Sequence, residues 1–454
     1  MSSMPPKYVS TTNACKLCAP LGAALAFKGV AGAVPFLHGS QGCATYMRRY
    51  IISHFNEPID IASSALGEKN AIFGGGPNLK LGLTNVIKKY RPELIGIATT
   101  CLTETIGDDV GRFLFEYVRE VNDPALLPKL VRVSTPSYSG THMDGFHAAV
   151  TALLETLAEN VAINDTVTVL PGLVSPADLR HLREIMVDFA LPPVILPDYS
   201  DTLDGPALSR YQNIPAGGTT IDEISKTGSS RAVIEFGRTL VDYHGGGKFL
   251  EKRFGRTRHC LGLPIGIRET DAFFNVLTSL SNREAMPANY SAERGRLIDS
   301  MVDGHKYLSG KRAVIYGEED LVVGLTAFLS EIGVKPVLCA SGGKSGHLAE
   351  AIRAVTDGVL AESPLIRAGT DFFEIAEEAT ALSPDLIIGH SKGYPLARKL
   401  AIPLIRLGFP IHDRMGGQRI LHIGYRGAQR LFDEIVNAII EQKQTASPVG
   451  YSYM

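Results

Sequence analysis

Short runs of apolar, often β-branched residues alternate along the chain with longer amphipathic stretches. Six of these runs have the length and composition of buried strands: Ala33 to Leu37, Leu94 to Ala98, Val167 to Leu170, Ala313 to Tyr316, Pro336 to Cys339 and Leu386 to Gly389. Leu179 to Phe189 and Leu321 to Ile332 each follow such a run, and their apolar residues recur at helical spacing. Strands that alternate with helices predict an α/β fold with mainly parallel sheets flanked by helices.

The order of these elements divides the 454 residues into three segments. A chain of this length has room for about three domains at roughly 150 residues each. Residues 1–160 carry four of the six cysteines, residues 161–300 open with a strand, a turn and a helix, and residues 301–454 open with a helix and a β-α-β unit. We therefore predict three α/β domains with these boundaries.

Charge and composition narrow the class of protein. The 45 basic and 47 acidic residues nearly balance, which argues against the basic footprint of nonspecific nucleic-acid binding. No apolar run reaches the length of about 18 residues that a transmembrane helix needs, and the N-terminus lacks the apolar core of a signal peptide. We expect a cytoplasmic protein that uses its cysteines as thiols or metal ligands rather than as disulfides.

Three cysteines stand at positions suited to a ligand site. Cys43 ends the glycine-rich turn LHGSQGC, and Cys101 ends IGIATTC, so both follow predicted parallel strands. Cys18 precedes a helix of small residues. Ligands of open α/β sheets bind in the crevice outside the carboxyl ends of the strands, and thiolates are the usual ligands of iron–sulfur clusters.

Other readings of these cysteines remain open. They could be buried thiols that act as small hydrophobic residues. Cys15 and Cys18 have CxxC spacing, but no second pair completes the four ligands of a structural zinc site. Three ligands also cannot complete a cubane cluster alone, so an iron–sulfur reading implies a partner chain.

Three stretches of the first segment resemble the N-terminal region of β-type subunits of nitrogenase component-1 proteins: CAPLGAALAFKGVAGAVPFLHGSQGCATYMRRY, HFNEPIDIASSALGEKNAIFGG and YRPELIGIATTCLTETIGDDV. A weaker similarity continues through GHKYLSGKRAVIYGEEDLVVGLTAFLSEIG and the closing GFPIHDRMGGQRILHIGYRGAQRLFDEIVNAI. The resemblance implies three Rossmann-like α/β domains. It also implies an iron–sulfur cluster that an α-type and a β-type subunit share at their interface.

The resemblance carries ligand roles onto particular residues. The β-side thiolates of the family lie in CxPLGA, HGSQGC and TTC motifs, which correspond here to Cys18, Cys43 and Cys101. A serine in the family's TPSF segment can also bind the oxidised eight-iron P-type cluster; here the segment reads TPSYSGTH, so Ser137 is the nearest match, and an ordinary turn serine is the alternative. Six thiolates across the subunit pair suit an eight-iron cluster (8Fe-7S), and a four-iron cluster (4Fe-4S) remains possible.

The resemblance also implies partners. The family forms α2β2 heterotetramers in which the α-type subunit holds the active-site cofactor, and an ATP-dependent iron protein docks over the interface cluster. The stretch GGGK from Gly245 to Lys248 lacks Walker spacing and predicts a flexible loop. We therefore expect nucleotide to bind the iron protein and not this chain.

Two functions fit these features. The first is the electron-relay β-type subunit of a nitrogenase-like reductase, for example a methylthio-alkane reductase; the second is a NifN-type scaffold for iron–molybdenum cofactor assembly. Only 17 residues precede Cys18, fewer than expected for a true molybdenum-nitrogenase β subunit, which argues against dinitrogen as the substrate. Some scaffold subunits retain only the HGSQGC cysteine, whereas this chain has all three, so the reductase is favoured. A binding module with inert cysteines is the third possibility.

We predict structural roles for the remaining cysteines, histidines and acidic residues. Cys260 and Cys339 read as structural thiols, and Cys15 as a structural thiol that could reach the cluster edge. The histidines at predicted strand ends or loops read as hydrogen-bonding residues: His38, His390, His412 and His422. The acidic residues near the cysteine turns read as capping or solvated groups: Glu68, Glu104, Asp108 and Asp109.

Overall fold

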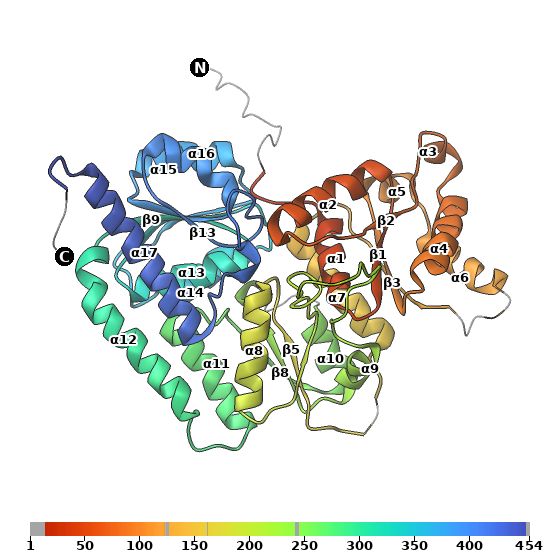
Figure 1. Ribbon diagram of the computed structural model, residues 1–454, viewed down its shortest axis with the longest axis horizontal. Coiled ribbons are helices and arrows are strands. Elements are labelled where there is room, and N and C mark those ends of the chain that lie inside the picture. The colour runs from red at the N-terminus through yellow and green to blue at the C-terminus, as the bar shows by residue number, and fades with distance from the viewer. Residues whose placement is uncertain (1–13, 122, 124–126, 161, 241–244, 451–454) are drawn as a thin grey trace.

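Three parallel β-sheets follow one another along the chain, and helices cover them (Figure 1). The computed structural model describes residues 14–121, 123, 127–160, 162–240 and 245–450. The first sheet has the order β2-β1-β3-β4, the second β6-β5-β7-β8 and the third β11-β10-β9-β12-β13. Every pairing between these strands is parallel. The predicted fold class of α/β domains with parallel sheets is therefore confirmed.

The strands are β1 (Ala33–His38), β2 (Ala62–Ser63), β3 (Leu94–Thr99), β4 (Lys129–Val133), β5 (Val167–Leu170), β6 (Pro193–Ile195), β7 (Ala232–Phe236), β8 (Thr257–Leu261), β9 (Arg312–Gly317), β10 (Lys335–Ser341), β11 (Leu365–Ala368), β12 (Leu386–Gly389) and β13 (Leu404–Arg406). All six predicted strands are present, and the other seven were not predicted. Each sheet lies within one of the three predicted segments, while the domain boundaries themselves stay a prediction.

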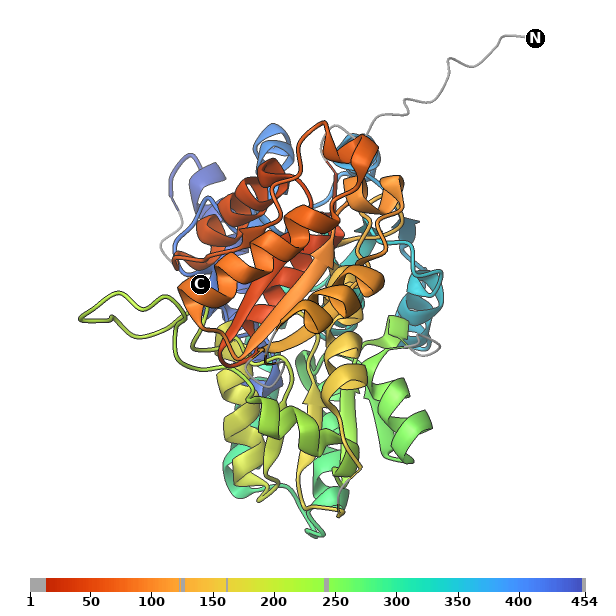
Figure 2. The same ribbon diagram turned by 90° about the vertical axis from the view of Figure 1, so that its right-hand side faces the viewer.

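The helices are α1 (Ala19–Lys28), α2 (Gln41–Phe55), α3 (Asn70–Phe73), α4 (Gly76–Tyr90), α5 (Cys101–Ile106), α6 (Val110–Glu120), α7 (His142–Leu157), α8 (Pro176–Asp188), α9 (Ile221–Lys226), α10 (Gly246–Phe254), α11 (Gly266–Leu280), α12 (Ala288–Leu308), α13 (Glu319–Glu331), α14 (Leu348–Thr356), α15 (Phe372–Leu382), α16 (Tyr394–Leu400) and α17 (Gly424–Ala446). The two helices predicted after strands correspond to α8 and α13, the small-residue helix after Cys18 is α1, and the helix predicted at the start of the third segment is α12. Helix α17 returns to pack beside α12 and α11, which precede the third sheet (Figure 1). The long loop between β6 and α9 projects from the body in Figure 2, and its residues 206–213 are exposed.

Helices α1 and α7 cross at backbone contact. Every residue of α1 is buried, and its small side chains allow the approach. A Cβ added at Gly22 of α1 would lie 1.6 Å from the carbonyl oxygen of His142, and one at Gly145 of α7 would lie 1.9 Å from that of Ala19. Glycine is therefore required at both positions. The crossing fixes the amino-terminal ends of the two helices against each other.

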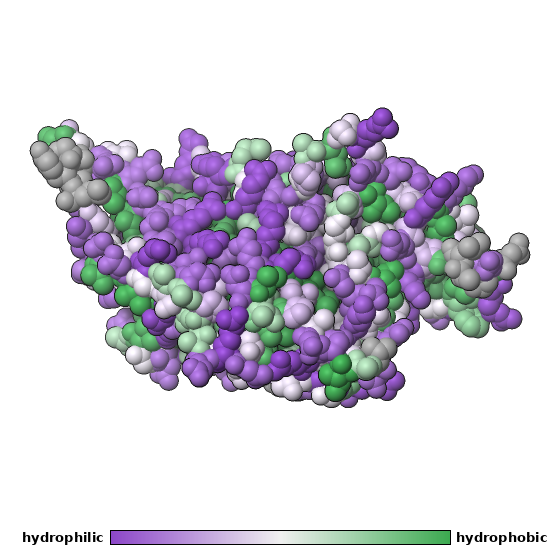
Figure 3. All heavy atoms as spheres, turned by 60° about the horizontal axis from the view of Figure 1, so that its bottom comes forward, coloured by the Kyte–Doolittle hydropathy of each residue, from purple (hydrophilic) through white to green (hydrophobic). Residues whose placement is uncertain are grey.

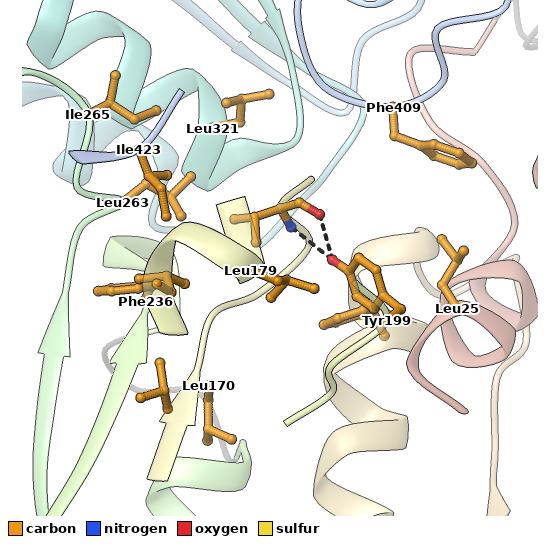
Figure 4. Packing of buried hydrophobic residues seen from close by; sticks show 14 of the residues in the cluster. Leu25, Leu170, Leu179, Tyr199, Phe236, Leu263, Ile265, Leu321, Phe409 and Ile423 are labelled. Carbon is orange, nitrogen blue, oxygen red and sulfur yellow. Dashed lines mark hydrogen bonds between the residues drawn. The ribbon is translucent and has the colours of Figure 1, made fainter. Parts of the chain in front are cut away.

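One continuous hydrophobic core joins the three sheets. Its members include Leu25 of α1, Leu170 of β5, Phe236 of β7 and Leu321 of α13 (Figure 4). The buried Tyr199 satisfies its hydroxyl within this core, because it donates to the Val174 carbonyl at 2.7 Å and accepts from the Val174 amide at 3.1 Å. By contrast, the face at the bottom of Figure 1 is mainly hydrophilic with scattered apolar side chains (Figure 3), as is normal for a protein surface.

A buried carboxylate ties the second sheet's helices to the last helix of the chain. Asp178 of α8 accepts from the amides of His422 and Ile423 at 2.9 and 3.2 Å, and from the amide of Ser175 at 2.9 Å. The His422 ring lies 2.9 Å away. Burial alone would raise the pKa of Asp178, but His422 and the backbone donors hold it below its usual value. The position of α17 thus depends on a fully bonded carboxylate.

The α1–α7 crossing makes a direct prediction. Gly22→Ala should destabilise the protein by about 3 kcal/mol or more, because the backbone on both sides of the contact must move. Gly295→Ala is the matched control: Gly295 lies within α12 and its added Cβ meets no atom within 4 Å. The control should leave stability unchanged or raise it by up to about 1 kcal/mol through helix propensity. Denaturant unfolding of both variants tests this, and equal stabilities would contradict the role of the crossing.

Candidate metal centre

The register of the first sheet brings the candidate ligands to one edge. His38 at the end of β1 pairs with Thr99 at the end of β3, so the turns that lead to Cys43 and Cys101 leave the sheet side by side. A Cβ at Gly39 would lie 2.2 Å from the Thr100 hydroxyl, which shows how closely the two turns approach. Cys43 lies in the first turn of α2, and Cys101 is the first residue of α5.

The third cysteine reaches this edge through α1. Cys18 is the N-cap residue of that helix. All three cysteines thus stand at the amino-terminal ends of helices, where the helix dipole favours a thiolate. Cys101 is exposed, whereas Cys18 and Cys43 are partly buried. The three thiols lie close enough for Cys43 and Cys101 to act electrostatically on Cys18.

Ser137 lies between two of these cysteines. Its amide donates to Cys101 Sγ at 3.2 Å, and its hydroxyl accepts from the Ala19 amide at 3.1 Å. The hydroxyl also hydrogen-bonds to Cys18. The structure therefore brings together all four residues that the sequence singled out.

The thiol of Cys18 is poorly suited to ionise alone. Burial raises its pKa, and the neighbouring Cys101 and Cys43 raise it further, while Ser137 and Lys392 act in the opposite direction. A metal supplies the positive charge that such a group needs to become a thiolate. The described part of the chain contains no group of three or more His, Cys, Asp or Glu side chains that could hold a single metal ion. In an iron–sulfur cluster the thiolates bind irons at several corners of the cluster rather than one shared ion, so three spaced thiols on one open edge fit part of a cluster.

The residue before Cys18 is anchored by a buried pair. The amide of Leu17 donates to His142 Nδ1 at 3.2 Å, and His142 Nε2 donates to a carboxylate oxygen of Glu318 at 2.9 Å. The His142 amide also donates to the Leu17 carbonyl at 3.0 Å. Burial alone would raise the pKa of Glu318, but His142 holds it below its usual value. Sequence reasoning missed both residues, since they lie 176 positions apart and form no motif.

The other cysteines lie elsewhere. Cys15 is 3% exposed in the core of the third sheet beside Tyr316, and burial raises its pKa to about 12. Cys339 contacts the Thr326 hydroxyl at 3.2 Å, and Cys260 donates to the Gly237 carbonyl at 3.3 Å. Burial raises the pKa of Cys339 to about 12 and that of Cys260 to about 11. These environments suit structural thiols.

Several histidines and acids near the turns make structural bonds. His38 contacts the Ser64 hydroxyl and the Asp108 carboxylate, both at 3.0 Å. Asp109 caps α6 by accepting from the Arg112 amide at 2.9 Å. Glu104 accepts from the hydroxyls of Thr99 and Ser134, His390 is buried, and Glu68 is exposed.

The stretch GGGK is not a loop, so that prediction was wrong. Gly246, Gly247 and Lys248 form the first turn of α10. The Gly247 amide donates to Glu235 at 3.1 Å, and a Cβ there would lie 2.5 Å from the same carboxylate. The glycines therefore serve close packing rather than flexibility.

A cavity of about 340 Å³ is lined in part by Cys15 and Lys16 of the segment that precedes Cys18. Its lining includes Lys16, His142, Glu319 and Lys344, but none of the three candidate thiols.

None of the helices in the described part of the chain has both the length and the apolar character that crossing a membrane requires.

Comparison with known proteins identifies the family. Residues 18–440 match the family described as nitrogenase component 1 type oxidoreductase. The chain belongs to this family. It is 36% identical to the nitrogenase molybdenum-iron protein beta chain of Clostridium pasteurianum over 95% of this chain and 93% of that protein. It is 33% identical to the iron-molybdenum cofactor biosynthesis protein NifN of a Nostoc species, over 97% and 96% of the two chains.

A solved structure agrees with this assignment. A chain of "Nitrogenase Cp1 at pH 6.5" superposes with a TM-score of 0.95 at 33% identity, covering 100% of this chain and 98% of the other. The predicted membership of the component-1 family as a β-type subunit is therefore confirmed. Both a molybdenum-iron beta chain and a NifN scaffold protein are among its relatives.

Substitution of His142 tests whether the His142–Glu318 pair anchors the segment before Cys18 in this component-1 subunit. His142→Ala leaves Glu318 buried without its partner, which should cost about 3–5 kcal/mol of stability. Because the pKa of Glu318 is lowered in the folded protein, the wild-type pair contributes above the unfolded-state pKa of about 4.3 and loses this contribution as the pH falls. The variant should therefore be less stable at neutral pH, and the gap should narrow in acid.

Denaturant unfolding at several pH values measures both effects. His305→Ala is the control, since His305 is exposed and its ring hydrogen-bonds to the Val302 carbonyl of its own helix. An equal loss in the two variants would contradict the anchoring role of His142.

Proposed function

We propose that this chain is the electron-relay β-type subunit of a nitrogenase-like reductase. In this proposal half of the ligands of an interfacial eight-iron P-type cluster come from Cys18, Cys43 and Cys101. Ser137 would add an oxygen ligand when the cluster is oxidised. The observation that carries the proposal is the meeting of three thiols and Ser137 on one edge of the first sheet. When bound, the cluster would accept and pass on electrons one at a time.

The surroundings of the thiols support a shared site. Large apolar side chains are exposed near the cysteine turns: Tyr46 lies one turn after Cys43, and Tyr138, 67% exposed, follows Ser137. Phe73, 83% exposed, lies at the end of α3, which packs against the helix that begins at Cys101. Exposed apolar groups around polar ligands are typical of protein interfaces. We infer that an α-type subunit completes the cluster within an α2β2 assembly.

The electron donor in this proposal is an ATP-dependent iron protein that docks over the interface cluster. This chain would orient the cluster ligands and favour their thiolate forms. The three thiols lie at helix amino termini, and the buried His142–Glu318 pair holds the segment that carries Cys18. Lowering the mobility of ligand-bearing segments favours one cluster geometry.

The second candidate is a NifN-type assembly scaffold, which the 33% identity to the Nostoc NifN protein keeps open. The two candidates differ in the cluster they need. A relay subunit requires all three thiolates for an eight-iron cluster, whereas a scaffold with a four-iron cluster can depend on Cys43 alone.

Single substitutions should separate the ligands from the structural thiols. Cys18→Ala, Cys43→Ala and Cys101→Ala should each lower the iron content of the αβ complex, because ligand loss weakens both metal binding and the fold around it. Cys43→Ala should have the largest effect, since the glycine-rich turn brings its backbone closest to the cluster. Iron analysis and the redox-dependent EPR signal measure the loss.

Cys339→Ala serves as the control, with iron content unchanged and a stability cost of about 1–3 kcal/mol. The ligand assignment would be wrong if Cys43→Ala retained full iron and an unaltered signal, or if Cys339→Ala lost the cluster.

Iron counting decides between relay and scaffold. The αβ complex, produced in cells that lack the cofactor assembly machinery, should carry only its interface cluster. We expect about eight irons per αβ pair, and near-complete loss of that form in Cys18→Ala and Cys101→Ala. About four irons that persist in both variants would favour the scaffold. A complex without iron or sulfide would exclude both.

A further inference from the structure

A lysine of the third domain holds the segment that leads to Cys18. Lys392 follows β12, within the short turn Ser391–Gly393. Its ammonium donates to the carbonyl of Ala14 at 2.9 Å and lies 3.5 Å from the carbonyl of Lys16. It thus contacts the backbone on both sides of Cys15, and Ala14 lies 378 positions before Lys392 in the sequence.

Other contacts press the same segment onto the carboxyl edge of the third sheet. Ala14 forms an antiparallel bridge with Asp371. A Cβ at Gly342 would lie 2.4 Å from the carbonyl oxygen of Cys15, so the chain crosses the sheet edge at backbone contact. Residues 14–17, here named the ligand arm, therefore have little freedom, and Cys18 directly follows them.

The charge of Lys392 has no carboxylate partner within salt-bridge distance in the described residues. Its ammonium lies 5.9 Å from the centre of the Tyr50 ring. Burial lowers the pKa of Lys392 below its usual value, and Tyr50 acts in the opposite direction. The contact of Lys392 with the Lys16 carbonyl places the ammonium two residues from Cys18 in the sequence. A partly buried cation beside a candidate ligand is screened less by solvent than a surface lysine.

We propose that Lys392 is a positioning residue for Cys18 and supplies a fixed positive charge beside the interfacial cluster. The inference rests on the proposed function, because it requires that Cys18 binds a cluster. Two consequences follow. The ligand arm should loosen when the ammonium is removed, and the cluster should become harder to reduce, because a nearby positive charge stabilises the more negative, reduced state.

The test compares Lys392→Gln with Lys392→Arg in the assembled αβ complex. Lys392→Gln removes the charge at similar length, whereas Lys392→Arg retains it. In Lys392→Gln the equilibrium constant for reduction of the cluster should fall about tenfold. For a one-electron couple this moves the midpoint potential about 59 mV to more negative values. Lys392→Arg should stay close to the wild-type potential.

Hydrogen exchange measures the arm independently of cluster content. Amides of residues 14–18 should exchange faster in Lys392→Gln than in the wild type, including in complex from which iron has been removed. Lys335→Gln is the matched control. Lys335 is an exposed lysine of the same domain, and it begins β10, whereas the ligand arm crosses the sheet beyond the carboxyl end of that strand. It should change neither the potential nor the exchange.

The outcomes separate the two proposals. A wild-type complex without a cluster would overturn the proposed function itself. A wild-type complex with a cluster, beside a Lys392→Gln variant with unchanged exchange and potential, would overturn the role of Lys392 alone. Equal shifts of the potential in the Arg and Gln variants would refute the charge effect, and unchanged exchange in iron-free Lys392→Gln would refute the positioning effect.

Discussion

The candidate site depends on the contact between α1 and α7. Because Gly22 and Gly145 let the two backbones touch, the amino-terminal ends of both helices meet at one point. Cys18 caps one helix and His142 begins the other. Any side chain at the crossing would separate them and move Cys18 away from Ser137. A packing constraint between two helices therefore sets the spacing of the polar groups.

The site is assembled from segments that are distant in sequence. The first sheet contributes two turns and aligns them through the pairing of His38 with Thr99. The third domain contributes Glu318 and Lys392, which hold the ligand arm from the opposite side. Burial makes the thiol of Cys18 hard to ionise, and in the proposed cluster site a metal would supply the positive charge that its thiolate needs. The fold thus positions the three thiols through contacts of its own residues.

The sequence predicted the buried core of the fold better than its edges. The six predicted strands are continuous apolar runs, whereas six of the seven unpredicted strands, β7 excepted, lie at sheet edges, where short or polar strands are common. The central strand β7 was missed because it contains Glu235, a buried carboxylate that Arg258 of the neighbouring strand pairs at 2.6 Å. Cys18, Cys43, Cys101 and Ser137 could be singled out because each lies in a recognisable motif. His142 and Lys392 could not, since their roles exist only after folding brings distant segments together.

The hydrogen bond from Lys392 to the Ala14 carbonyl has a consequence for synthesis of the chain. The amino-terminal domain leaves the ribosome first, but the lysine that holds its ligand arm is made 378 residues later. At about 5–20 residues per second, the interval is roughly 20–75 seconds. During that time Cys43 and Cys101 can reach their places on the first sheet, while Cys18 still lacks its final restraint. If the three thiols bind a cluster as proposed, the nascent chain would offer iron its complete set of positioned thiols only when translation is almost finished and the third domain is available.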